Sequence, residues 1–265
     1  CPHQLIMTAT PIPRTLSMTM YADLDVSVID ELPPGRKPIQ TVLLSTDKRE
    51  AIITRVQANC RTGRQAYWVC TLIDESEVLQ CQAAENTATQ LQAIIPDLKI
   101  GLVHGRMKSA LKEAVMQAFK QGDIDLLVAT TVIEVGVDVA NASLMIIENP
   151  ERLGLSQLHQ LRGRVGRGSE ASFCVLLYQT PLSVNAEQRL KIMRESQDGF
   201  YIAEADLKLR GPGEVLGTRQ SGAMRFKVAD LIRDEALVDA VAELSHLILN
   251  SYPECVGLIL KRWLQ

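Results

Sequence analysis

The run Gln-Leu-Arg-Gly-Arg-Val-Gly-Arg at residues 160–167 is the part of this sequence best suited to chemistry. Arg164 and Arg167 stand three residues apart, so on a helix their side chains would point to the same side. Each guanidinium stays charged and matches phosphate oxygens, and pairs of such groups stabilise a transferring phosphoryl group. Gly163 and Gly166 allow a backbone or a phosphate to come close. The run indicates a phosphate-handling site, and the alternative is a basic surface turn.

A second polar segment, at residues 130–138, has the sequence TTVIEVGVD. The hydroxyls of Thr130 and Thr131, with the backbone amides that open a helix, can hold a phosphate. Gly136 permits close backbone approach, and the Asp138 carboxylate can accept hydrogen bonds from a ribose hydroxyl or an arginine. One element could therefore touch both a nucleic-acid backbone and a nucleotide.

Strand and helix patterns alternate through the middle of the chain and would position these segments. Almost continuously apolar runs predict buried strands at 39–44, 66–70, 100–103, 126–129, 144–147 and 173–178. Helical periodicity falls between them, at 48–60, 78–95, 109–120 and 156–165. Ser109 is expected to cap the third of these helices and Gly122 to end it. This order predicts an α/β fold, a parallel sheet with helices on both faces.

Polar loops follow three of the predicted strands, at residues 104–106, 130–131 and 149–151. Ligands of open α/β sheets gather outside the carboxyl ends of the strands. We therefore expect these loops to form one shared site, although each could be an ordinary turn between a strand and a helix.

The two ends of the chain differ from this central pattern. Residues 5–7 could form a strand, and the prolines and glycine at 33–35 predict a linker. Helices at 185–196 and 201–209 could form a hairpin before a glycine-rich stretch at 211–222, and two closing helices are predicted within 230–250 and 254–263. We expect three parts, at 1–34, 35–182 and 183–265.

The composition and charge of the chain limit the classes of function that it could have. The net charge of −3 and the pI of about 5.9 do not indicate a nucleic-acid binder, so such a role would depend on local clusters of arginine and lysine. The six cysteines include no C-x-x-C pair, which favours reduced, buried thiols over a metal site. No apolar run approaches the roughly 20 residues that span a bilayer. The first residue is Cys1, and we expect the chain to be part of a longer protein.

Several motifs occur in the order found in superfamily 2 helicases. Residues 8–11 (TATP) resemble motif III, 66–70 lie where motif IV lies, 102–107 (LVHGRM) resemble the next strand-end motif, 125–138 resemble motif V, and 157–168 resemble motif VI. Residues 206–222 (DLKLRGPGEVLGTRQSG) resemble the translocation motif of RecG-type branch-migration helicases and transcription-repair coupling factors, and their details favour the RecG family. The resemblance implies a RecA-like second helicase lobe, followed by a helical hairpin and a helical extension.

The resemblance also implies roles for individual residues. Arg164 and Arg167 would contact the ATP phosphates, with Arg167 as the arginine finger, while Gly136, Asp138 and Gln160 would contact or sense the nucleotide. The remaining residues would bind DNA or couple the ATP site to it: Thr8, Thr10, His104, Gly105, Arg106, Thr130, Thr131, Arg210 and Gln220. The implied activity is ATP-dependent remodelling of branched DNA, such as stalled forks and Holliday junctions, in recombination and repair. A duplex translocase of the transcription-repair coupling type and a non-enzymatic interaction module are the alternatives.

One departure from the family pattern limits the expected activity. The sequence contains no G-x-x-x-x-G-K-[ST] phosphate loop and no suitably placed Asp-Glu pair for Mg²⁺. In the family a preceding lobe carries both, so most contacts to ATP and Mg²⁺ would come from there and this chain alone should hydrolyse no ATP. The resemblance further implies branched or duplex DNA as partner, a monomer without membrane contact, and a bacterial, cytoplasmic, nucleoid-associated location.

Aromatic residues and a histidine near these motifs have simpler interpretations. Tyr67 and Trp68 lie in an apolar run and are expected in the core. His159 is expected to pack or cap a helix, because phosphoryl transfer here needs no histidine base. Arg225 and Lys227 could contact phosphate or simply face solvent.

Overall fold

The computed structural model describes residues 36–71, 77–134, 139–168, 170–210 and 237–263, and the single positions 5, 7, 27, 29 and 31. The chain divides into two compact units. The first unit, residues 31–202, is called the lobe below. The second unit contains residues 1–30 and 203–265. Each unit is described by itself.

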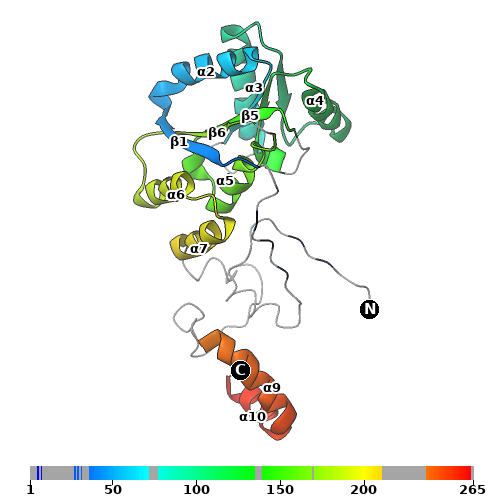
Figure 1. The fold of residues 1–265 in the computed structure, drawn as a ribbon, viewed down its shortest axis with the longest axis vertical. Helices are drawn as coiled ribbons and strands as arrows, with labels where there is room; N and C mark the ends of the chain where they lie inside the picture. The colour runs from blue at the N-terminus through cyan, green and yellow to red at the C-terminus, as the bar shows by residue number, and fades with distance from the viewer. Residues whose placement is uncertain are drawn as a thin grey trace. The chain divides into compact units, whose positions relative to one another are not determined.

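A six-stranded parallel sheet forms the centre of the lobe (Figure 1). Its strands are β1 (Ile39–Ser45), β2 (Gln65–Cys70), β3 (Ile100–Val103), β4 (Leu126–Ala129), β5 (Ala142–Glu148) and β6 (Ser172–Tyr178). They lie in the order β1-β6-β5-β2-β4-β3, and every neighbouring pair is parallel. Their carboxyl ends therefore share one edge of the sheet, as the sequence predicts.

Helices cover both faces of the sheet, as the sequence predicts. In the lobe they are α2 (Arg49–Arg61), α3 (Glu77–Ile94), α4 (Ser109–Gln121), α5 (Leu155–Arg162) and α6 (Val184–Glu195), with 3-10 turns η1 (Thr46–Lys48), η2 (Thr131–Glu134) and η3 (Pro150–Arg152). Figure 1 shows α2 and α3 over one face, and α5 and α6 over the other. Helix α7 (Gly199–Arg210) begins in the lobe, and α9 (Val238–Ser251) and α10 (Pro253–Trp263) follow.

Strands β2 and β4 are buried on both faces of the sheet, which explains why they are apolar along almost their whole length. Trp68 packs with Val56 of α2 and Leu91 of α3 on one face. Tyr67 points to the other, where its ring meets Phe119 of α4 at a centroid distance of 4.9 Å. Both aromatic residues of β2 are almost fully buried, which confirms that they are core residues.

Three local expectations differ from the structure. Helix α5 ends at Arg162 rather than at 165, because the chain turns at Gly163 and Gly166 has a φ of +75°. Ser109 is the first residue of α4, and the preceding Lys108 occupies the N-cap position without a side-chain cap. Leu5 and Met7 are not in a strand and are exposed, while residue 6 lies outside the described residues.

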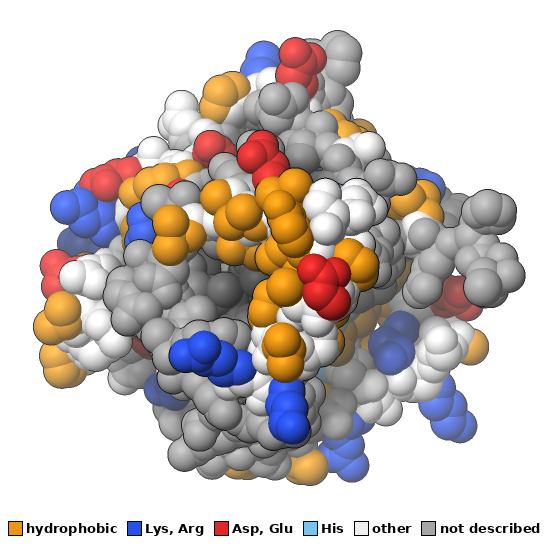
Figure 2. All heavy atoms as spheres, turned by 90° about the horizontal axis from the view of Figure 1, so that it is seen from below, with side chains coloured by type: hydrophobic (Ala, Val, Ile, Leu, Met, Phe, Trp, Pro, Cys, Tyr) orange, Lys and Arg blue, Asp and Glu red, His pale blue; other side chains and the backbone are white. Residues whose placement is uncertain are grey.

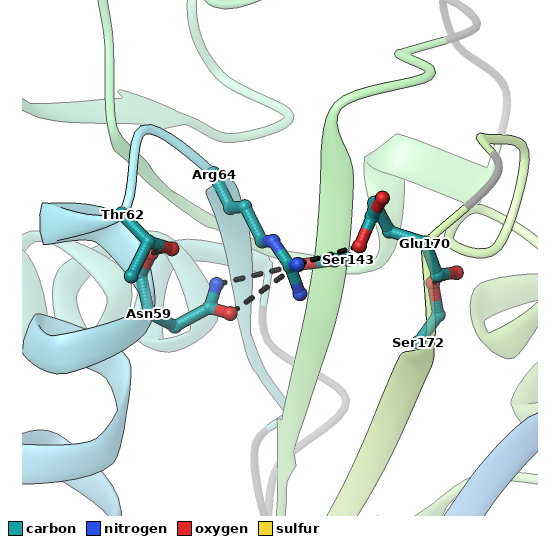
Figure 3. Close-up of polar contacts among 6 residues, drawn as sticks. All are labelled: Asn59, Thr62, Arg64, Ser143, Glu170 and Ser172. Carbon is teal, nitrogen blue, oxygen red and sulfur yellow. Dashed lines mark hydrogen bonds and ion pairs between the residues drawn. The ribbon is translucent and has the colours of Figure 1, made fainter.

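The amino ends of three strands are closed by a polar cluster (Figure 3). The Nη2 atom of Arg64 donates to Glu170 Oε2 at 2.6 Å, and Asn59 Nδ2 lies 3.4 Å from Ser143 Oγ. Ser172 Oγ donates to the carbonyl of Glu170. This cluster joins the end of α2 to the starts of β2, β5 and β6. It lies at the edge opposite the polar loops and serves to hold the sheet together.

Among the residues of 237–263 whose side chains are described, none is buried. Helices α9 and α10 instead expose large apolar side chains, among them Leu244, Leu247 and Leu258. Figure 2, which views Figure 1 from below, shows exposed hydrophobic side chains gathered on this face. The core of the described structure therefore lies in the lobe.

Candidate functional site

The arginine run forms a turn rather than a continuation of α5. The amide of Gly163 donates to the carbonyl of His159 at 3.0 Å, and that of Arg164 donates to Leu161 at 3.0 Å. The left-handed residue Gly166 then redirects the chain. Arg164 and Arg167 both lie beyond the end of the helix, so the expectation that helical spacing aligns them does not apply. Residues 163–168 are called the arginine turn below.

The carbonyl of Gly163, just after α5, accepts hydrogen bonds from two arginines. Arg167 Nε donates to it at 3.3 Å, and Arg36 Nη2 donates to it at 3.2 Å from the segment before β1. The last carbonyls of a helix have no partner within the helix and carry its negative partial charge, so they attract cations. Arg167 is exposed and Arg164 is half-buried. No sequence pattern signals the involvement of Arg36.

At two glycines of the turn, neighbouring atoms leave no room for a side chain. A Cβ atom at Gly166 would lie 2.8 Å from Ile39 Cγ1, and one at Gly168 would lie 2.6 Å from the carbonyl oxygen of Ala140. At Gly163 the nearest atom, the carbonyl oxygen of Gln160, would be 3.3 Å away. The sequence predicts that a backbone or a phosphate comes close to the glycines, and in the structure atoms of the protein itself do so. These atoms fix the turn against β1 and the segment before β5.

The loops after β3 and β4 meet at the carboxyl edge of the sheet. The amide of Thr130 donates to the carbonyl of Val103 at 3.2 Å, and Thr130 is buried. The ring of His104 is also buried, with Nε2 3.3 Å from Glu85 Oε1 of α3. No described residue forms a hydrogen bond with its buried Nδ1 atom. Arg106 and Lys108 are exposed cations of this loop, and Arg106 is the one that the family resemblance assigns to the DNA.

The loop after β5 is hydrogen-bonded to the ends of neighbouring strands. The amide of Asn149 donates to Leu177 at 2.9 Å, and its Nδ2 atom donates to the carbonyl of Thr71 at 3.3 Å. Thr71 Oγ1 donates in return to the carbonyl of Asn149 at 2.8 Å. β2 separates β5 from β4 in the sheet. Asn149 therefore joins the ends of β2, β5 and β6, and only the loops after β3 and β4 adjoin directly.

Comparisons with known proteins agree with this architecture. Residues 47–169 match the family described as "Helicase conserved C-terminal domain". Residues 196–257 match the family described as "ATP-dependent DNA helicase RecG, domain 3, C-terminal". The ATP-dependent DNA helicase RecG of Escherichia coli K12 is 66% identical over 264 residues, which are 99% of this chain and 38% of the relative. This chain corresponds to the C-terminal part of RecG helicases.

Further RecG proteins support the same assignment. RecG of Bacillus subtilis is 47% identical over 94% of this chain and 37% of its own length. A solved structure described as "Structure of RecG bound to three-way DNA junction" matches with a TM-score of 0.69 and 44% identity, over 87% of this chain and 30% of that one. The chain thus spans less than two-fifths of the length of these two RecG proteins from E. coli and B. subtilis.

Several residues that the RecG resemblance singles out have no described side chain. Thr8, Thr10, Gly136, Asp138 and Gln220 lie outside the described residues. Arg210 is the last residue of α7, and only its backbone is described. Gln160 on α5, Thr131 at the start of η2, and Gly105 are half-buried. Arg225 and Lys227 also lie outside the described residues. The roles assigned to all of these residues stay predictions.

The described parts of the lobe and of the second unit show neither a metal site nor a membrane span. No group of three or more His, Cys, Asp or Glu side chains there could hold a metal ion. Within the same residues, every helix is too short or too polar to cross a bilayer.

Arg162, which is buried, and His159, which is half-buried, lie on α5 just before the arginine turn, and no sequence pattern assigns either of them a role in phosphate binding. Arg162 Nη2 lies 3.0 Å from His159 Nδ1. Burial, then the positive charges of Arg162 and Arg36, lower the pKa of His159 from 6.5 to about 4. The ring is therefore neutral at pH 7, which agrees with the predicted packing role.

The depressed pKa of His159 predicts a pH-dependent stability. Between pH about 6.5 and 4 the unfolded chain protonates His159 while the folded chain does not, so the free energy of unfolding falls as the pH falls. Urea unfolding of this chain should show a steeper loss across that window than the variant His159→Gln, by up to about 1.4 kcal/mol per pH unit. Equal slopes for the two proteins would contradict the burial of a neutral ring.

Proposed function

We propose that this chain is the C-terminal part of an ATP-dependent DNA helicase that remodels branched DNA, such as stalled forks and Holliday junctions, in recombination and repair. The arginine turn is the main support. It carries Arg164 and Arg167 just after α5 in a lobe built on a parallel sheet, and the chain is 66% identical to a RecG helicase. Guanidinium groups held in this way suit the charge that develops on a transferring phosphoryl group.

For ATP, we assign Arg164 and Arg167 to the phosphates, and Gly136, Asp138 and Gln160 to nucleotide contact or sensing. Arg167 is exposed, and its Nε atom lies 3.3 Å from the carbonyl of Gly163, a long hydrogen bond that costs little to exchange for one to a phosphate. The sequence has no phosphate loop of the G-x-x-x-x-G-K-[ST] type. A separate lobe would therefore supply that loop and the Mg²⁺ ligands.

For DNA, we assign the edge formed by the loops after β3 and β4 to the phosphate backbone. Arg106 is exposed and can reach a phosphate, whereas His104 and Thr130 are buried. His104, Gly105, Thr130 and Thr131 would then act mainly through backbone groups and by shaping the edge, a common way to position DNA. Thr8 and Thr10 would couple the ATP site to the DNA, and Arg210 and Gln220 would take part in translocation.

The domain division at 1–34, 35–182 and 183–265 stays part of the proposal. The two family matches, at 47–169 and 196–257, fall within the second and third parts and support it. We further propose that the protein acts as a monomer in the bacterial cytoplasm, at the nucleoid and without membrane contact. The second candidate function is duplex translocation without strand separation, which the same arginine turn could drive.

The proposal predicts a contrast between this chain and the full-length protein that carries it. The full-length protein should hydrolyse ATP in a DNA-stimulated manner, whereas the purified chain should release no phosphate from ATP above a protein-free blank. A phosphate-release assay at equal molar concentrations would compare them. Steady hydrolysis by the isolated chain that Arg167→Ala leaves unchanged would contradict the proposal.

A further inference from the structure

Arg162, the last residue of α5, connects the arginine turn to the end of α6. Its Nη1 atom donates to the carbonyls of Met193 at 2.7 Å and Ser196 at 2.8 Å. The same atom lies 3.3 Å from Thr41 Oγ1 of β1, and Nη2 donates to His159. One side chain therefore holds three elements, and it immediately precedes Gly163, the first residue of the turn.

The contacts of Arg162 are unusual for a buried charge. Only 2% of the residue is exposed, and no carboxylate among the described residues pairs with it. Its acceptors are instead the carbonyls at the carboxyl end of α6, which have no partners within that helix and carry its negative partial charge. Arginine suits this position because its planar group can donate to several acceptors at once. Loss of the guanidinium would leave these buried carbonyls without donors.

His159 extends the connection to the start of α7. Because a guanidinium can only donate, His159 Nδ1 must accept, and its Nε2 atom then carries the proton. A Cβ atom at Gly199, the first residue of α7, would lie 3.2 Å from that Nε2. The amide of Ile39 donates to Gln197 Oε1 at 2.9 Å, which ties the α6–α7 connection to β1 as well. The last turn of α5 is thus in contact with both ends of that connection.

We propose that Arg162 is a positioning residue that couples the arginine turn to the α6–α7 connection, so that a change at the turn on ATP hydrolysis moves the helices used for translocation. The inference rests on the proposed function. Arg162 is buried too deeply to touch nucleotide or DNA. It acts through the carbonyls of Met193 and Ser196, and His159 holds its guanidinium in place.

A purely structural Arg162 would behave differently from a coupling one. If it only stabilised the lobe, substitution would lower ATP hydrolysis and DNA remodelling in the same proportion, as the folded fraction fell. If it couples the two, the folded protein would still hydrolyse ATP but would separate fewer base pairs for each ATP consumed. The ratio of strand separation to ATP hydrolysis therefore distinguishes the two roles.

The experiment measures that ratio on a synthetic fork with the full-length protein that carries this chain. Arg162→Met removes the donors while keeping an extended side chain, and Arg162→Lys keeps the charge but not the planar fork. Arg194→Met is the matched control, since Arg194 lies on α6 beside Met193 but is exposed, and its ion pair is with its neighbour Glu195. Urea unfolding of each variant reports its stability separately.

We expect Arg162→Met to lower the ratio by at least about fivefold, the lower end of typical coupling between sites. Arg162→Lys should lower it less, and Arg194→Met should leave it unchanged. Should neither variant at position 162 fold, Thr41→Val removes only the 3.3 Å contact and should lower the ratio about twofold. A wild-type ratio in the folded variants would overturn the inference alone. A wild-type protein without ATP hydrolysis or remodelling would overturn the proposed function and the inference together.

Discussion

Replacing Arg167 with alanine in the full-length protein should lower the rate of DNA-stimulated ATP hydrolysis by about a thousandfold, the lower end of the range for arginine fingers. The side chain is exposed at the end of α5, where its Nε atom donates to the carbonyl of Gly163. Removal of that weak contact should cost little stability, because exposed interactions of this kind contribute little. A large kinetic loss with an unchanged unfolding midpoint would mark a role in chemistry.

The control for Arg167→Ala is Arg55→Ala, which removes an exposed arginine from α2, away from the turn. It should leave the hydrolysis rate within about twofold of wild type, since isolated surface charges have small effects. A steady-state phosphate-release assay at saturating ATP and DNA measures both. If the two variants hydrolyse ATP at equal rates, Arg167 is not the arginine finger, and Arg164 becomes the residue to test.

Replacing Gly166 with alanine should have a large effect on stability. Its φ of +75° disfavours any side chain, and the new Cβ would lie 2.8 Å from Ile39 Cγ1. Left-handed backbone costs about 1–2 kcal/mol for a residue other than glycine, and overpacking adds about 1–3 kcal/mol. We expect a loss of about 2–5 kcal/mol in the free energy of unfolding, measured with urea on this chain.

Gly63→Ala separates these two contributions. Gly63 has a similar φ of +82°, but a Cβ there would meet no atom within 4 Å. The Gly63 variant should therefore lose only the backbone part, about 1–2 kcal/mol. Equal losses at the two positions would show that Ile39 moves aside freely and that the turn is not fixed against β1.

The parts of the fold that sequence patterns predict are those decided by local chemistry. β4 falls at 126–129 as predicted, because an apolar run bounded by polar residues suits a strand buried on both faces. β3 falls at 100–103 as predicted, although alternate residues of this edge strand are only half-buried. Gly122 ends α4 with a φ of +85°, which is the conformation that glycine readily adopts. Helices α2 and α6 begin and end within one residue of expectation.

The details of the candidate site depend on contacts that sequence spacing does not reveal. The arginines at 162, 164 and 167 look alike in the sequence, yet only Arg162 is fully buried, because β1 and α6 approach it from 121 and 31 residues away. Arg36 reaches Gly163 across 127 residues. The role of His104 at the DNA stays a prediction, and its contact with Glu85 of α3 is one that sequence spacing does not reveal. Each difference arises from tertiary packing, which brings together residues that are distant in the chain.

ATP-dependent strand separation of a synthetic replication fork tests the central claim most directly. The full-length protein that carries this chain would be compared with its Arg167→Ala and Arg55→Ala variants on a fork with one labelled strand. We predict that wild type and Arg55→Ala release the labelled strand only when ATP is present, and that Arg167→Ala releases none. A wild-type protein that hydrolyses ATP in a DNA-stimulated manner but releases no strand would contradict the helicase assignment in favour of duplex translocation.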